Sequence, residues 1–464
     1  MDTLAAARAV GGRALGAPAT FLRVTTDSRA IAPGDLFVAL KGERFDGHDY
    51  VSDALRAGAA AALVADARAD ALTCATTGAA AGSLIAVTDP QAALAALARH
   101  WRMRFDIPVV VVVGSNGKTT TKEMIASIFR EAVGVAQVHA TPGNFNNAIG
   151  LPLTLLGLRE THRLAVVEIG MNHRGETSEL AAIARPTAAV VTNAQREHQE
   201  FMQSVADVAR EHADAIAALS PSGTAIVNAD DPHAQVWRDA ARAAGARVVD
   251  FALAERAAIT ARVAPRADGA DLAISTPQGE LAVALAVPGR HMAGNALAAA
   301  AAALAVGVPF AAIARGLAAF RAVRGRMTVR DLADGVRIIG DTYNANPDSV
   351  RAAIDVLCAA PGTRRLALGD MGEVGAQGPA FHREIGAYAR AAGVARRYAV
   401  GAAMADAGQA LGEGAVHFAD ADALAARLRA ELRGGDTVLV KGSRFMRMER
   451  VVEALAGAAV EESH

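Results

Sequence analysis

The chain has 464 residues, carries a net charge of −1 and is 52% apolar. This length predicts about three domains, and the balanced charge argues against a surface that binds nucleic acid. The two cysteines, Cys74 and Cys358, form no CxxC pair, so neither a disulfide framework nor a cysteine zinc site is expected. The N-terminus makes a poor signal peptide, and no run of about 18 apolar residues is free of charge. We therefore expect a cytoplasmic protein with no membrane span.

The first 90 residues mix extended and helical patterns. The stretch "GDLFVALKG" is typical of a strand, and residues 48–63 predict a helix. Residues 64–82 are rich in alanine and low in complexity, and we assign them no function. A long helix is predicted over 89–105 and places a domain boundary there. We predict a small N-terminal α/β domain over residues 1–100.

The next part of the chain repeats a strand–loop–helix rhythm. Unbroken apolar strands that alternate with helices indicate a parallel sheet covered on both faces. From 257 to 287 apolar and polar residues alternate, which predicts a small antiparallel addition, and a helix follows at 295–305. We predict a central P-loop ATPase-like domain over residues 101–324, with parallel strands at 109–113, 164–169, 188–192 and 224–228.

After residue 325 the α/β rhythm starts again. Short apolar strands with helices of ordinary length between them predict a second open sheet. The fold class is therefore α/β with three domains. We predict a Rossmann-like C-terminal domain over residues 325–464, with strands at 336–340, 366–369, 398–400 and 437–440.

The stretch "PVVVVVGSNGKTTTKEM" from Pro108 has the features of a phosphate-binding loop. The pattern G-x-x-x-x-G-K-[ST] fails, because Val112 stands where its first glycine belongs. A strand still enters the turn and a helix leaves it, so backbone N–H groups would face phosphate oxygens. The alternative is a Gly-rich turn with a solvated lysine. We predict a nucleotide site made of Gly114, Ser115, Asn116, Gly117, Lys118, Thr119 and Thr120.

Two polar residues follow neighbouring strands of this domain. Glu168 closes "LAVVEIG", and His198 lies in "NAQREHQE" after the next strand. Ligands collect at the carboxyl ends of strands in open α/β sheets, so both side chains are candidates for a magnesium site with Thr119. The alternatives are a solvated loop acid and a loop histidine that binds nothing.

At this point several stretches resemble the Mur ligases of bacterial cell-wall synthesis. "GSNGKTTTKEM" is similar to the ATP loop of that family, which has this short glycine spacing. "TPGNFNNAIGLPLTLL", "VEIGMNHRGE", "TNAQREHQE" and "PGRHMAGNALAAAAAA" resemble its later signatures, in order. The resemblance implies ATP and Mg²⁺ as cofactors, with Lys118, Glu168 and His198 as catalytic residues. It places Asn295 at the adenine and brings Arg326 into the site from a domain junction.

Four further stretches resemble members that join D-alanyl-D-alanine to UDP-N-acetylmuramoyl-tripeptide. They are "DSRAIAPGDLFVALKGERFDGH", "GDTYNANPDSV", "LGDMGEVGAQGPAFHREIG" and "VLVKGSRFMRME". An acyl phosphate would form on the tripeptide carboxylate before the dipeptide amine attacks. A likeness to the ligase that adds the third amino acid is the nearest alternative, and a non-catalytic nucleotide-binding protein is another. We expect a monomer.

The same resemblance distributes substrate contacts over the three domains. Ser28 would bind the uridine diphosphate, and Asp341 and Asn344 would approach the nucleotide. Domain closure with hinges near 100–108 and 322–328 would bring the groups together. The sugar-peptide route would be lined by Thr141, Asn144, Asn147 and Arg174, and the D-alanyl-D-alanine pocket by His382, Lys441, Ser443 and Arg444.

Two departures from the family pattern stand out. The family commonly carries a carbamoylated lysine in the helix after the magnesium histidine, but this chain has no lysine between Lys122 and Lys441. His212 falls at that position by approximate alignment, either as a ligand or as a surface helix residue. In "GRHMAGN", Met292 replaces an asparagine that many members have.

Overall fold

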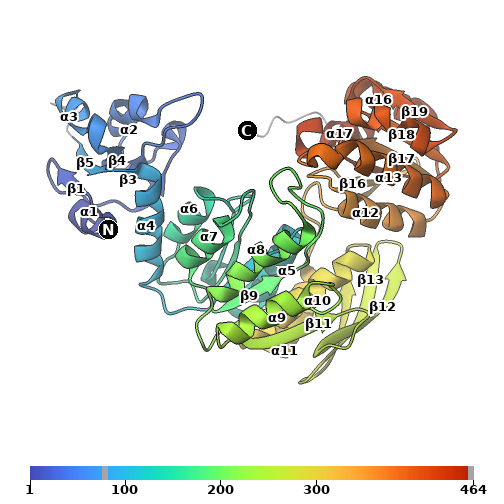
Figure 1. Ribbon diagram of the computed structural model, residues 1–464, viewed down its shortest axis with the longest axis horizontal. Coiled ribbons are helices and arrows are strands. Elements are labelled where there is room, and N and C mark those ends of the chain that lie inside the picture. Colours follow the sequence, from blue (N-terminus) through green and yellow to red (C-terminus); the bar gives the residue numbers. More distant parts are fainter. Residues whose placement is uncertain (76–81, 458–464) are drawn as a thin grey trace. The chain divides into compact units, whose positions relative to one another are not determined.

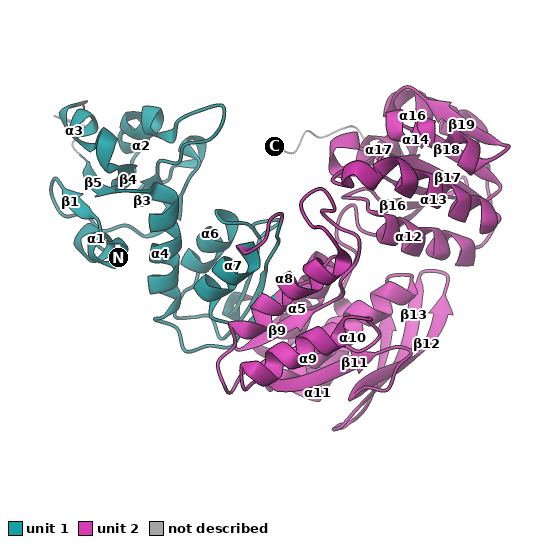
Figure 2. Cartoon of the chain, viewed as in Figure 1, with its two compact units in different colours: residues 1–111, 136–171, 176–186 teal, residues 112–135, 172–175, 187–464 magenta. Residues whose placement is uncertain are grey.

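The computed structural model describes residues 1–75 and 82–457 (Figure 1). Residues 76–81 of the Ala-rich stretch therefore lie outside the described residues. Within the described residues the strands form three sheets of five, nine and six strands. The chain divides into two compact units (Figure 2). Unit 1 holds residues 1–111, 136–171 and 176–186, and unit 2 holds 112–135, 172–175 and 187–464. The three predicted domain boundaries stay a prediction.

The five-stranded sheet belongs to the first part of unit 1. Its strands are parallel except the edge strand β1, which pairs antiparallel with β5. Their order is β1 (Arg13–Leu15), β5 (Ser83–Val87), β4 (Ala61–Ala65), β3 (Asp35–Val38) and β2 (Arg23–Thr25). The helices are α1 (Thr3–Val10), α2 (Val51–Arg56), α3 (Asp66–Ala75) and α4 (Pro90–Arg102), with 3₁₀ turns η1 (Ser28–Ala30) and η2 (Gly47–Tyr50).

The helix predicted over 48–63 is wrong in its second half. Helix α2 ends at Arg56, Gly58 takes a left-handed φ of 109°, and Ala61–Ala65 forms the buried strand β4. A short apolar run has no periodicity that separates a buried strand from a helix. The strand in "GDLFVALKG" and the helix predicted over 89–105 are confirmed as β3 and α4.

The nine-stranded sheet carries the phosphate loop. Its central parallel strands are apolar and buried, as strands covered on both faces require. Its order is β14 (Gly279–Leu285), β13 (Gly269–Thr276), β12 (Ile259–Arg266), β11 (Arg247–Ala252), β10 (Thr224–Asn228), β9 (Ala188–Val191), β6 (Val109–Val113), β8 (Leu164–Glu168) and β7 (Val138–Ala140). The helices are α5 (Lys118–Val133), α6 (Gly150–Leu156), α7 (Glu176–Ala184), α8 (Val205–Ala217), α9 (Ala234–Ala243), α10 (Arg290–Ala305) and α11 (Phe310–Ala319), with 3₁₀ turn η4 (Val135–Gln137).

The predicted elements of this sheet are confirmed with small shifts. Strands β6 and β10 have the predicted bounds, and β8 and β9 each end one residue early. Strands β12, β13 and β14 pair antiparallel, as the alternating pattern predicted. Helix α10 begins at Arg290 rather than at 295, because the glycine before it is the N-cap.

The six-stranded sheet forms the C-terminal part of unit 2. Five strands are parallel, and the edge strand β15 pairs antiparallel with β16. The order is β15 (Thr328–Asp331), β16 (Arg337–Asp341), β20 (Asp436–Lys441), β17 (Thr363–Gly369), β18 (Arg396–Val400) and β19 (Ala415–Phe418). The helices are α12 (Pro347–Ala359), α13 (Gly378–Ala391), α14 (Ala402–Asp406), α15 (Gly408–Leu411), α16 (Ala421–Glu431) and α17 (Glu449–Ala456), with 3₁₀ turns η5 (Gly375–Gln377) and η6 (Arg444–Met446). All four predicted strands are present.

In the described part of the chain, every helix is too short or too polar to cross a membrane.

Helix α5, which carries the phosphate loop at its start, is held by close packing against α11. A Cβ added to Gly316 of α11 would stand 2.3 Å from the Cα atom of Ile128 in α5. The carbonyl of Gly316 also accepts a hydrogen bond of 2.7 Å from Ser127. The glycine therefore fixes the distance between the two helices.

Gly316→Ala should destabilise the protein by about 1–3 kcal/mol, because the added methyl group meets backbone and forces α5 and α11 apart. Gly294→Ala in α10 is the matched control: its new Cβ would meet only Leu253, at 3.8 Å. That change should be neutral or stabilise by up to about 1 kcal/mol, as alanine does in helix interiors. Thermal unfolding measures both, and equal stability of the two variants would contradict this packing.

Candidate active site

The phosphate loop runs from the end of β6 to the start of α5, and its two glycines are required by its geometry. Gly114 and Gly117 have φ angles of 131° and 86°, in the region that favours glycine. A Cβ on Gly114 would lie 2.0 Å from Thr192 Oγ1, and one on Gly117 would lie 2.4 Å from Asn295 Oδ1. Val112 stays inside the strand, so the missing glycine of the longer pattern is not needed.

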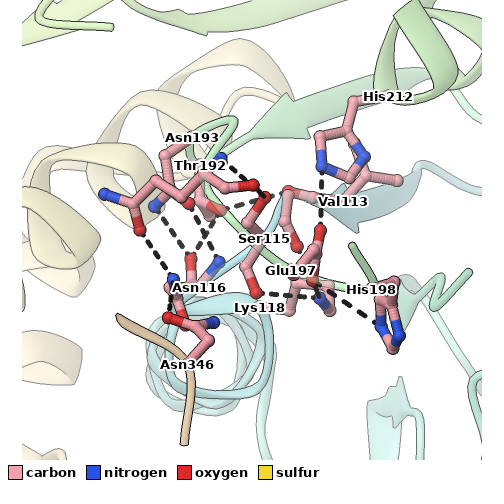
Figure 3. Close-up of polar contacts among 12 residues, drawn as sticks. Val113, Ser115, Asn116, Lys118, Thr192, Asn193, Glu197, His198, His212 and Asn346 are labelled. Atoms are coloured by element: carbon pink, nitrogen blue, oxygen red, sulfur yellow. Dashed lines mark hydrogen bonds and ion pairs between the residues drawn. The ribbon is translucent and has the colours of Figure 1, made fainter. Parts of the chain in front are cut away.

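The loop after β9 braces the phosphate loop (Figure 3). Thr192 Oγ1 donates to the carbonyl of Asn116 at 2.7 Å, and the Asn116 amide donates to Asn193 Oδ1 at 2.9 Å. The backbone amide of Gln195 donates to Ser115 Oγ at 2.8 Å. These bonds hold Ser115 and Asn116 in place, which is the preorganisation that a phosphate cradle needs.

Lys118 lies folded back into its own loop. Its Nζ atom donates to the carbonyls of Gly114 at 2.5 Å and Ser115 at 3.1 Å. It also lies 3.2 Å from Oε2 of Glu197, in the loop after β9. The ammonium is thus surrounded by oxygen acceptors of the protein.

Glu197 is a buried carboxylate, 6% exposed, between a lysine and two histidines (Figure 3). His212 Nε2 on α8 lies 3.3 Å from Glu197 Oε1, a contact without good hydrogen-bond alignment, and His198 Nε2 lies 3.9 Å from Oε2. Burial opposes ionisation of Glu197, but the charge of Lys118 and the contacts with the histidines outweigh it and lower the pKa to about 2. Glu197 is therefore an anion at neutral pH.

His198 joins this loop to the C-terminal part of unit 2. It has a left-handed φ of 48°, and its Nδ1 atom lies 3.0 Å from Oε2 of Glu373. Non-glycine residues adopt this conformation at a cost and are often found at functional sites. His212, the position of the missing lysine, is buried rather than on the surface.

Other predicted nucleotide residues of unit 2 lie around the same loop. Thr119 Oγ1 accepts a 2.9 Å hydrogen bond from Arg326, whose guanidinium stacks on Tyr343 at 4.0 Å. Asn295 is buried beside Gly117, and its Nδ2 atom lies 3.8 Å from the sulfur of Met292. Thr120 is buried at the start of α5.

The predicted residues of the C-terminal sheet form a second buried cluster. Lys441 Nζ donates to Asp341 Oδ2 at 2.5 Å and to the carbonyl of Asn344 at 2.9 Å. Ser443 Oγ accepts from the Gly372 amide at 2.7 Å. This cluster lies where β16 and β20 end, because Asp341 and Lys441 are register partners.

Two other residues predicted for the dipeptide pocket have different surroundings. His382 is buried, and its two ring nitrogens are engaged by the Met371 amide at 2.9 Å and the Gly378 carbonyl at 2.7 Å. In this structure it ties a loop to α13. Arg444 is exposed at 69% and lies 3.3 Å from Glu449.

Unit 1 contains Glu168 and most of the predicted sugar-peptide residues. Glu168 ends β8, which neighbours β6 in the sheet. The Oε1 atom of Glu168 accepts a hydrogen bond from Asn146 at 2.7 Å, and its backbone amide donates to Thr141 Oγ1 at 2.9 Å. Oδ1 of Asn147, in the loop before α6, accepts from the amide of Gly150, the first residue of that helix, at 2.8 Å. The remaining predicted residues are Asn144 in the same loop, Ser28 at the start of η1, and Arg174 of unit 2, which pairs with Asp207 at 2.8 Å.

Sequence reasoning missed Glu197 and its neighbour Arg196. Arg196 Nη2 pairs with Asp348 of α12 at 2.6 Å, its Nη1 pairs with Glu384 of α13 at 2.7 Å, and its backbone amide also donates to Asp348. Asn116 and Asn346 exchange side-chain bonds nearby. A signal was present, since "QREHQE" places a base and an acid directly before His198.

The phosphate loop lies on a largely parallel sheet, and the C-terminal part of unit 2 contacts it through Arg196, Asn116 and Arg326. These features are typical of nucleotide-binding α/β proteins. Three family models match the chain in order. They are the Mur ligase family catalytic domain over residues 20–102, the Mur ligase middle domain over 112–303, and the Mur ligase glutamate ligase domain over 325–444.

Relatives of known name resemble the chain over nearly its whole length. The UDP-N-acetylmuramoyl-tripeptide–D-alanyl-D-alanine ligase of Escherichia coli (strain K12) is 40% identical over 458 residues, which is 96% of each chain. The crystal structure of MurF from Acinetobacter baumannii matches with a TM-score of 0.88, 31% identity and 98% of each chain. That of the MurF ligase from Thermotoga maritima in complex with ADP matches with a TM-score of 0.80 and 28% identity, over 94% of this chain and 97% of that one. The chain belongs to the Mur ligase family, whose members are ATP-dependent ligases.

Arg196 and Asp348 should show a coupling energy of about 1–3 kcal/mol in a double-mutant cycle, because their charged hydrogen bonds lie largely out of water. The cycle uses Arg196→Gln, Asp348→Asn and the double variant in urea unfolding. The exposed pair Arg242–Asp239, also an arginine and an aspartate at 2.7 Å, is the control and should show little coupling. Equal coupling in the two pairs would contradict the contact between the loop after β9 and α12.

Proposed function

We propose that this chain joins D-alanyl-D-alanine to UDP-N-acetylmuramoyl-tripeptide, with conversion of ATP to ADP and phosphate, as a cytoplasmic monomer in peptidoglycan precursor synthesis. The observation that carries the proposal is 40% identity, over 96% of both chains, to a relative of that name. The phosphate loop, with Lys118 at the start of α5, further supports the proposal. A ligase for the third amino acid is disfavoured, because "GDTYNANPDSV" and "VLVKGSRFMRME" resemble the dipeptide-adding members.

A free carboxylate has no good leaving group, and its phosphorylation by ATP supplies one. The tripeptide carboxylate attacks the γ-phosphorus, the bond to the β–γ bridging oxygen breaks, and ADP leaves. The dipeptide amine then attacks the acyl phosphate, and inorganic phosphate leaves as the amide forms and the amine loses a proton. Lys118 neutralises charge on the β- and γ-phosphates, and the N-terminus of α5 offers its amides to them. Catalysis is mostly positioning and charge neutralisation.

Mg²⁺ fits the donors that this chain offers. Thr119, Glu168 and His198 supply a hydroxyl, a carboxylate and an imidazole, and Mg²⁺ usually combines one or two carboxylates with substrate phosphates and water. In residues 1–75 and 82–457, no three His, Cys, Asp or Glu side chains converge as a ready-made metal site. When bound, Mg²⁺ neutralises the phosphate oxygens.

The substrate residues are proposed for this chain domain by domain. Ser28 serves the uridine diphosphate, and Thr141, Asn144, Asn147 and Arg174 serve the sugar-peptide. Asn295, Arg326, Asp341 and Asn344 serve the nucleotide. Lys441, Ser443 and Arg444 form the basic end of the dipeptide pocket, where a carboxylate-ended ligand needs a cation. His382 supports that pocket through its bonds to Met371 and Gly378.

The direct test is phosphate release by the purified full chain with ATP, Mg²⁺, UDP-N-acetylmuramoyl-tripeptide and D-alanyl-D-alanine. Lys118→Ala should lower the rate by about 100- to 1,000-fold or more, as loss of a group that stabilises developing charge does. Arg130→Ala removes a positive charge from the exposed side of the same helix and should leave the rate unchanged.

A panel of amine acceptors decides between the family members. The proposal expects turnover with D-alanyl-D-alanine and none with meso-diaminopimelate or lysine on the dipeptide precursor. Turnover only with those amino acids would overturn the choice of substrate, and an unchanged rate in Lys118→Ala would remove the phosphate loop from the reaction.

A further inference from the structure

Glu197 is a buried acid that the reaction as described does not use. Its exposure is 6%, and its oxygens lie against Lys118 at 3.2 Å and His212 at 3.3 Å. A buried carboxylate without a positive partner is strongly unfavourable, so its charge has to be compensated in every state of the site. Lys118 supplies that charge in this structure.

Lys118 cannot keep this position when it serves the nucleotide. Its ammonium faces the carbonyls of Gly114 and Ser115 together with Glu197, so its three N–H groups have protein acceptors. Phosphate oxygens can be reached only when some of these contacts are given up. Each contact that Lys118 moves to phosphate weakens the compensation of Glu197.

Among residues 1–75 and 82–457, the basic side chains paired with Glu197 besides Lys118 are two histidines, His198 and His212. His212 is buried at 2% side-chain exposure, and its Nδ1 atom has no hydrogen-bond partner in the described residues. Its Nε2 atom lies 3.3 Å from Oε1 without good hydrogen-bond alignment. The other oxygen, Oε2, faces Lys118 and lies 3.9 Å from Nε2 of His198, a proposed Mg²⁺ ligand. The carboxylate of Glu197 therefore faces the ammonium of Lys118 and lies beside His198, which is already proposed to bind Mg²⁺.

We propose that Glu197 is a further Mg²⁺ ligand, which exchanges the ammonium of Lys118 for a divalent cation when ATP binds. His212 is its positioning residue and fixes the carboxylate from α8. The proposal rests on the proposed function, because it assumes a nucleotide bound with Mg²⁺ in this loop. Its rival is a purely structural carboxylate that anchors Lys118 and never meets the metal.

The test counts Mn²⁺ ions on the full chain with a non-hydrolysable ATP analogue, from the loss of the free Mn²⁺ signal in electron paramagnetic resonance. Glu197→Gln keeps the shape of the side chain and removes its charge. At saturating analogue, shown by a parallel binding titration, it should bind one Mn²⁺ fewer than the unchanged chain. Glu197→Asp keeps a carboxylate and should retain that ion with lower affinity.

His212→Gln should keep the ion but weaken its affinity by about 10- to 100-fold, the effect typical of losing a group that orients a metal ligand. Glu200→Gln is the matched control, because it removes an exposed carboxylate three residues further along the same loop. It should leave Mn²⁺ binding unchanged. Thermal unfolding of each variant checks that the fold survives, and Glu197→Asp carries the test if Glu197→Gln does not fold.

An unchanged Mn²⁺ count and affinity in Glu197→Gln would overturn the proposal. If Glu197→Gln weakens binding of the ATP analogue but the analogue that still binds carries the full number of Mn²⁺ ions, the proposal is also overturned. That result would favour the role of Glu197 as an anchor for Lys118. Failure of the unchanged chain to bind Mn²⁺ with the analogue would instead count against the proposed function. The two failures are therefore distinguishable.

Discussion

The ion pair between Lys118 and Glu197 is the interaction on which the rest of this site depends. It holds an ammonium inside a loop whose backbone is already fixed by Gly114, Gly117 and the bonds from Thr192 and Asn193. The loop therefore keeps its shape and its ammonium in place through contacts with the protein itself. Binding of a nucleotide would be an exchange of partners around Lys118, since its ammonium lies against two loop carbonyls and Glu197.

A similar pair occurs at the end of the C-terminal sheet. Lys441 and Asp341 are buried register partners on β20 and β16, and Lys441 also caps the carbonyl of Asn344. The chain has only four lysines and uses arginine for nearly all other positive charge. Lys118 and Lys441 stand where a compact ammonium is surrounded by oxygens, a task for which the planar guanidinium of arginine is less suited.

Local pattern predicted most of the elements around the site, and distant contacts account for what it missed. The apolar run of β6 and the glycines after it are local features, so the phosphate loop could be located from sequence. The strand Ala61–Ala65 was mistaken for helix because its apolar run carries no period, and its partners β3 and β5 lie elsewhere in the chain.

The contacts of Glu197 and Arg196 could not be predicted from the sequence for the same reason, because their partners lie far away in the chain. Glu197 meets Lys118 across 79 residues, and Arg196 meets Asp348 across 152. No spacing rule connects residues so far apart. His382 illustrates the reverse case: the resemblance picked the residue, while only the structure shows that backbone groups engage both nitrogens of its ring.

Anomalous diffraction can show whether Lys118 moves from Glu197 to phosphate when the nucleotide binds. Crystals of the full chain grown with Mn²⁺ and a non-hydrolysable ATP analogue would locate the metal and the lysine together. We expect Lys118 on the phosphates and a Mn²⁺ peak in contact with a Glu197 carboxylate oxygen. A bound analogue with Lys118 still on Glu197, and no Mn²⁺ at that carboxylate, would contradict this expectation.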